Sequence, residues 1–66
     1  MKFFAHVMGP VASKNNKPIE LTDDLESSIE QFLATNSGWE TQTKSTRFAW
    51  LKNKSNASVR VIISQL

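Results

Sequence analysis

The fold is decided by residues 21–39, LTDDLESSIEQFLATNSGW, the segment in which apolar side chains recur with helical spacing. Thr22 can cap the first turn of this helix, and the helix dipole favours the acidic residues that follow it there. We therefore predict a helix over residues 22–36 with one apolar stripe at positions i, i+4, i+7 and i+8. The stripe consists of Leu25, Ile29, Phe32 and Leu33.

The end of this helix is marked by Asn36-Ser37-Gly38. Gly38 suits the left-handed position that often follows a helix, because glycine has no side chain to clash there. Trp39 comes next, and we expect its ring to fold back onto the end of the helix. The opposite, solvent-facing side of the helix is expected to hold Glu26, Ser27, Glu30 and Gln31.

Strand-like segments flank the helix on both sides. The first is rich in aromatic and branched side chains and stops at Gly9-Pro10, after which residues 9–18 have the composition of a loop. Residues 53–56 separate two apolar runs as a hairpin turn does. The expected strands are residues 2–8, 46–52 and 57–65, with a further short strand at residues 39–43.

The order strand, helix, then two or three strands indicates the fold class. We predict one α+β domain over residues 1–66, in which a single amphipathic helix packs on one face of a small antiparallel sheet. One helix covers one face only, so the other face stays open unless a partner covers it. We expect that open face to bind the partner and to carry Phe4, His6, Met8, Arg47, Leu51, Arg60 and Ile62.

The direction of Phe48 and Trp50 is not fixed by the sequence. We expect both to face the helix, because large aromatic residues dominate small cores, and this phase puts Leu51 on the open face. In the opposite case these two rings, together with Trp39, lie on the open sheet beside Arg47, Lys52 and Arg60, where nucleic-acid bases can stack on them. A binding role for the open face is then much stronger.

The composition removes several classes of site. The chain has no cysteine and one histidine, His6, which excludes disulfides, iron–sulfur clusters and thiolate or His-rich metal sites. The sequence contains no Gly-x-Ser-x-Gly elbow, Gly-rich phosphate loop or His-x-x-x-His pair, so we predict a non-enzymatic protein without cofactor or metal. Because no apolar run reaches membrane-spanning length and residues 2–8 are interpreted as a strand, not a signal peptide, we expect a cytoplasmic protein.

Charge is unevenly distributed, although the net charge is only +2. Residues 19–36 hold five acidic residues and no basic one, whereas residues 37–66 hold five basic residues and one acid. The basic half is either a surface for nucleic acid or an acidic protein, or simply a solvated turn. We favour the solvated turn and predict that the basic residues do not converge in one groove, since strands alternate their side chains. These residues are Lys44, Arg47, Lys52, Lys54 and Arg60.

Two functions fit these observations. The first is a protein-interaction module, an accessory, inhibitor or regulator of a larger protein, with a phage or another mobile element as one source. A chain of this size has a thin core and no disulfide, so we also predict a homodimer formed through the open face. The alternative is a small nucleic-acid-binding protein that uses the basic C-terminal hairpin.

Overall fold

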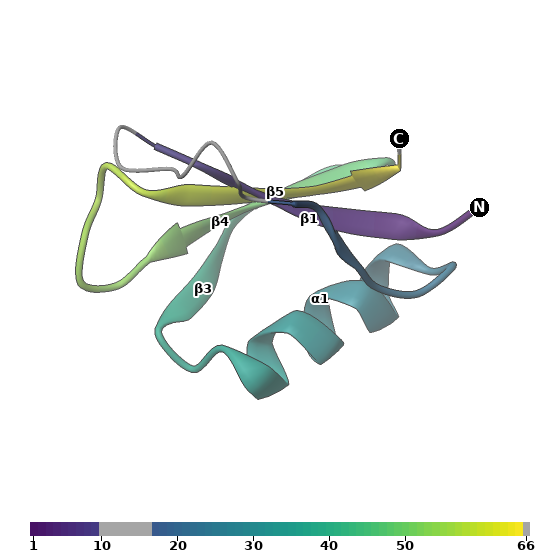
Figure 1. Cartoon of the computed structure of the whole chain (residues 1–66), viewed down its shortest axis with the longest axis horizontal. Coiled ribbons are helices and arrows are strands. Elements are labelled where there is room, and N and C mark those ends of the chain that lie inside the picture. The colour runs from purple at the N-terminus through teal and green to yellow at the C-terminus, as the bar shows by residue number, and fades with distance from the viewer. Residues whose placement is uncertain (10–16, 66) are drawn as a thin grey trace.

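The computed structural model describes residues 1–9 and 17–65, and most of the loop expected at residues 9–18 lies outside them. The elements are β1 (Phe3–Met8), β2 (Ile19–Glu20), α1 (Leu25–Thr35), β3 (Trp39–Lys44), β4 (Phe48–Asn53) and β5 (Arg60–Gln65). The sheet forms one layer and α1 lies on one side of it (Figure 1). The predicted α+β class, with one helix packed on an antiparallel sheet, is confirmed.

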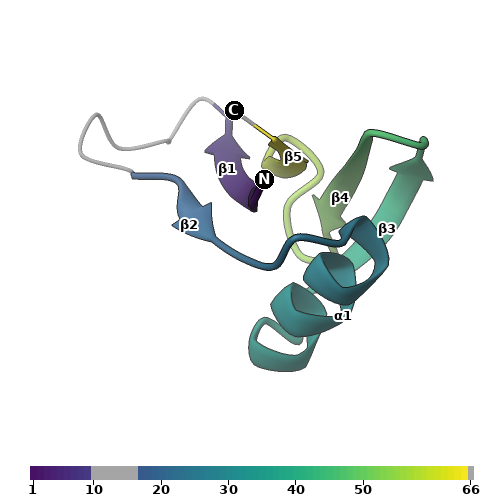
Figure 2. The ribbon, with the colours of Figure 1, turned by 90° about the vertical axis from the view of Figure 1, so that its right-hand side faces the viewer.

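Within residues 1–9 and 17–65 the sheet has five strands in the order β2-β1-β5-β4-β3, and each neighbouring pair is antiparallel. The first and last long strands, β1 and β5, lie side by side, with Phe3 opposite Gln65 (Figure 1). Figure 2 shows β2 at one edge and β3 at the other, with α1 beneath the sheet. The sequence did not predict β2, because a strand of two residues is too short to show alternation.

The first turn of α1 is capped by Asp24, not by Thr22 as the sequence suggested. The Asp24 carboxylate accepts a hydrogen bond from the backbone N–H of Ser27 at 2.9 Å. Thr22 bonds the helix differently: its backbone N–H donates to the Ser28 hydroxyl at 3.0 Å, and the two hydroxyl oxygens lie 2.9 Å apart. Ser28 is fully buried at 0% exposure, so these hydrogen bonds hold the segment that precedes α1 against the helix.

The other end of α1 also differs from the expectation. The Asn36 side-chain amide donates to the Phe32 carbonyl at 2.9 Å and so satisfies a group that the helix leaves unpaired. Gly38 does not have the positive φ that we expected there, so the prediction of a left-handed glycine is wrong. Trp39 does fold back onto the helix end: its ring lies edge-on to Phe32, with centroids 6.0 Å apart.

The core lies between α1 and the sheet face that α1 covers. Three residues of the predicted helix stripe are buried and the fourth, Leu33, is half-buried against them. On the sheet, Ile63 is flanked by Ala5 on β1 and Ala49 on β4, and these small side chains let α1 approach closely. The buried apolar residues are Phe3, Ala5, Leu21, Leu25, Ile29, Phe32, Ala49, Leu51, Val61 and Ile63.

The phase of β4 is opposite to the one we expected. Leu51 is fully buried in the core, so its expected place on the open face is wrong. Phe48 and Trp50 point away from α1 and are half-buried, so the expectation that they face the helix is wrong as well. Their rings would not fit under α1, where the sheet presents alanine at position 49 and where Phe3 and Phe32 already fill the aromatic volume.

Candidate functional site

The sheet face turned away from α1, here called the open face, is formed by alternate residues of β1, β5 and β4. Antiparallel pairing aligns these side chains across the three strands. The first row is Phe4, Ser64 and Phe48; the middle row is His6, Ile62 and Trp50; the last row is Met8, Arg60 and Lys52.

Apolar and aromatic side chains dominate the first two rows. Phe4, Phe48, Trp50 and Ile62 are each half-buried, and Met8 at the end of β1 is 48% exposed. Because they are neighbours in adjacent rows, these side chains form one continuous apolar patch. Within residues 1–9 and 17–65, the helix α1 lies on the other side of the sheet and does not cover this patch (Figure 1). Contiguous patches of this kind usually mark an interaction site.

The aromatic patch ends at a cation. The Arg60 guanidinium lies 5.9 Å from the centroid of the Trp50 ring, within the range of a cation–π interaction. Tryptophan and arginine are the side chains most enriched among residues that dominate binding energy at protein interfaces. The patch therefore has an aromatic centre with a charged group beside it.

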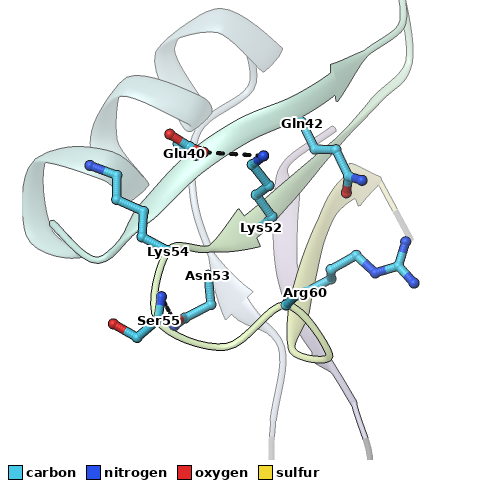
Figure 3. Close-up of a pocket in the computed structure, with 8 residues that line it drawn as sticks. Glu40, Gln42, Lys52, Asn53, Lys54, Ser55 and Arg60 are labelled. Atoms are coloured by element: carbon cyan, nitrogen blue, oxygen red, sulfur yellow. Dashed lines mark hydrogen bonds and ion pairs between the residues drawn. The ribbon is translucent and has the colours of Figure 1, made fainter.

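Beyond the last row, a polar hollow of about 710 Å³ opens between β3, β4 and the loop that leads to β5. The Lys52 ammonium pairs with the Glu40 carboxylate at 3.3 Å, and Figure 3 shows the Lys54 and Arg60 side chains pointing in opposite directions. The charged ends of the basic residues therefore do not meet at one point. The hollow is lined by Glu40, Gln42, Lys52, Asn53, Lys54, Ser55, Ala57 and Arg60.

The other basic residues lie elsewhere. Lys44 forms an ion pair with Glu26 on α1, and Lys2 lies 3.6 Å from Asp23 at the start of the same helix. Arg47 is exposed in the turn before β4. These two ion pairs partly neutralise the acidic residues at α1. On the side of the open face, the charged groups are Arg60 and the Lys52–Glu40 pair.

Five of the seven predicted site residues share the open face: Phe4, His6, Met8, Arg60 and Ile62. Leu51 does not, because it is buried in the core, and Arg47 precedes the strand.

The open face also holds Phe48, Trp50, Lys52 and Ser64, none of which was among the predicted site residues. The β4 sequence offered an ambiguous signal, since Arg47 would share a face with Leu51 and Lys52 shares a face with Trp50. Each face of β4 would therefore carry one charged residue, so the charges do not indicate which face of this strand is buried.

Over residues 1–9 and 17–65, no three His, Cys, Asp or Glu side chains are grouped to hold a metal ion. His6 lies in the middle row of the open face opposite the apolar Ile62. Within that same part of the chain, α1 is too short and too polar to cross a bilayer.

Comparison of the chain with protein-family models, curated proteins and solved structures finds no match. The function must therefore be argued from the open face itself.

Proposed function

We propose that this chain is a non-enzymatic protein-interaction module that docks on a protein surface through the open face. The observation that carries the proposal is the phase of β4, which adds Phe48 and Trp50 to the apolar side chains of β1 and β5. A patch with two more aromatic rings than the sequence indicated is large enough to anchor a partner.

The layout of the open face supports a protein partner. Its centre is apolar and aromatic, and its margin carries the Ser64 hydroxyl, the Arg60 guanidinium and the Lys52–Glu40 ion pair. Protein interfaces have this organisation, with a desolvated apolar centre inside a polar rim. An accessory protein, an inhibitor and a regulator each act by docking of this kind, and we propose one of these roles without a catalytic step.

A single-stranded nucleic acid is the second candidate, and one observation favours it. Phe48 and Trp50 are two residues apart on one strand, about 7 Å, and Arg60 lies beside them, so bases could stack along β4. Against this, Lys52 is already paired with Glu40, and Lys54 points away from Arg60 (Figure 3). A phosphate backbone would meet few converging cations, so the protein partner is the better supported occupant.

The test is capture of a partner by immobilised wild-type chain and by two matched variants. Ile62→Glu puts a negative charge into the middle of the open face, whereas Gln31→Glu puts the same charge on the exposed side of α1. We expect one protein from a native-host lysate to bind wild type and Gln31→Glu stoichiometrically and to be lost with Ile62→Glu. Equal capture by all three, with Ile62→Glu shown to be folded by circular dichroism, would contradict the proposal.

A parallel measurement addresses the second candidate. Affinity for a fluorescent single-stranded oligonucleotide is measured over a series of salt concentrations, since phosphate contacts give a steep dependence on salt. Strong, salt-sensitive binding that Trp50→Ala abolishes would favour the nucleic acid instead.

A further inference from the structure

We infer that the open face is covered by a second copy of this chain, in a two-fold dimer whose axis runs in the plane of the sheet and across the strands. This rests on the proposed function, because the second copy docks on the same open face that we propose as the interaction surface. Two features of the molecule favour this dimer, namely the arrangement of the rows on the open face and the state of the sheet edges, while the size of the open face limits its strength.

The open face is small, so a dimer formed through it is expected to be weak. The open face is three strands wide. Each strand has six residues, about 20 Å, and at ~4.8 Å of width per strand the three together cover about 14 Å. The projected area is roughly 280 Å² per copy and about 560 Å² for the two copies together, which is below the ~1,200 Å² at the low end of specific interfaces and belongs to weak, transient contacts. We expect so small a contact to be reversible and weak, with a dissociation constant on the order of 1–100 µM, although area alone does not set affinity.

The rows of the open face are self-complementary under this rotation. A half-turn about an axis across the strands keeps the strand order and reverses the strand direction, so the last row of one copy lies over the first row of the other. Arg60 then meets Ser64 of the second copy, Lys52 meets the Phe48 ring, and Met8 meets Phe4. Each cation faces a hydroxyl or an aromatic ring, and neither faces another cation.

The alternative rotation is less favourable. If the two-fold axis ran along the strands, each row of one copy would lie over the same row of the other copy. With that axis on β5, the two Arg60 side chains would face each other at the interface. Two cations brought together away from water repel strongly. Charge repulsion therefore favours the axis across the strands. This axis passes through the middle row, so Ile62 and Trp50 of one copy face Ile62 and Trp50 of the other copy.

The sheet edges do not offer an easier route to a dimer. β3 carries Glu40 and Lys44, and its register to β4 shifts between Thr41 and Thr43. Charged residues and a bulge are the features that prevent an edge strand from pairing with another chain. β2, at the opposite edge, is only two residues long.

Sedimentation equilibrium tests the dimer, with wild type, Ile62→Glu and the Gln31→Glu control compared over concentration. We expect wild type and Gln31→Glu to associate as dimers and Ile62→Glu to weaken association at least ~100-fold, because its two carboxylates would be buried against each other. A wild-type monomer throughout, or a dimer that Ile62→Glu leaves unchanged, would overturn the inference. A monomer that binds the oligonucleotide through Trp50 would assign the face to nucleic acid and overturn it as well.

The axis is tested by cross-linking, since the chain has no cysteine of its own. Facing sheets lie ~10 Å apart, which a short bis-maleimide reagent spans between two single-cysteine variants. We expect Ile62→Cys to cross-link to itself and Arg60→Cys to cross-link to Ser64→Cys. Ser64→Cys should not cross-link to itself, because its two copies are offset by about 14 Å along the strands. Efficient self-linking of Ser64→Cys would overturn the axis.

The two proposals fail separately. If the wild-type chain is a strict monomer and Ile62→Glu still abolishes partner capture, the dimer is ruled out and the proposed docking function stands. Unchanged partner capture and unchanged self-association with Ile62→Glu remove both.

Discussion

Replacement of Leu51 by alanine tests the phase of β4, on which the composition of the open face depends. Leu51 is fully buried between Thr41 on β3 and Val61 on β5, on the sheet side under α1. The change removes about three methyl or methylene groups worth ~0.8 kcal/mol each, and the cavity left behind raises the loss to about 3–5 kcal/mol. A 66-residue domain has a total stability of roughly 3–10 kcal/mol, so this one change should remove a third or more of it.

The assays are urea unfolding and thermal unfolding, each followed by far-ultraviolet circular dichroism at about 1 µM protein so that self-association contributes little. We expect Leu51→Ala to lower the melting temperature by at least about 12 °C. Lys52→Ala is the adjacent control and should cost less than ~1 kcal/mol, because it loses only an exposed ion pair.

A pair of lysine substitutions sharpens this test. Trp50→Lys should still unfold cooperatively, because a lysine on the open face can reach water, whereas Leu51→Lys should not fold. A cost below ~1 kcal/mol for Leu51→Ala, or a folded Leu51→Lys beside an unfolded Trp50→Lys, would refute the β4 phase and with it the aromatic open face.

Three further predictions concern the rest of the fold. Ser28→Ala should lower the free energy of unfolding by about 1–3 kcal/mol, because the Thr22 N–H loses its acceptor, as urea titration would show. Gly9→Ala should lower the free energy of unfolding by about 1–3 kcal/mol in the same assay, since φ is +156° and a Cβ there would lie 3.0 Å from the backbone carbonyl oxygen of Ser58. Gly38→Ala should be neutral or slightly stabilising, because no atom lies within 4 Å of a Cβ at that position. Phe32→Ala should cost about 3–5 kcal/mol, and near-ultraviolet circular dichroism should show the loss of tryptophan signal from the ring that packs against it.

The parts of the fold that the sequence predicted well are those with long, regular patterns. The helix stripe is an example, because four apolar residues at helical spacing leave one arrangement that buries them together. The contact of Trp39 with the helix end was also predictable, since the chain has to turn there. Strand ends moved by up to three residues, as at β5, because local preferences fix turns only loosely.

The parts that could not be predicted depend on tertiary packing. The phase of β4 follows from the row Ala5, Ile63 and Ala49 beneath α1, and a single strand sequence does not show which neighbours will flank it. The cap at Asp24 depends similarly on the long-range bond between Thr22 and Ser28, which takes the threonine away from the helix end. Consequently, the residues that we expected on the open face lie there on β1 and β5, whereas Leu51 on β4 does not.

The most direct test of the open face as a docking surface is the accessibility of Trp50 to acrylamide, a quencher of tryptophan fluorescence. Trp39→Phe leaves Trp50 as the only tryptophan, and Trp50→Phe leaves Trp39, on the helix side, as the control. If the open face is the interface, quenching of Trp50 should fall as the protein concentration is raised from about 1 to about 200 µM, across the expected dissociation constant, while quenching of Trp39 stays constant. Quenching of Trp50 that does not change with concentration or with added partner would contradict the account.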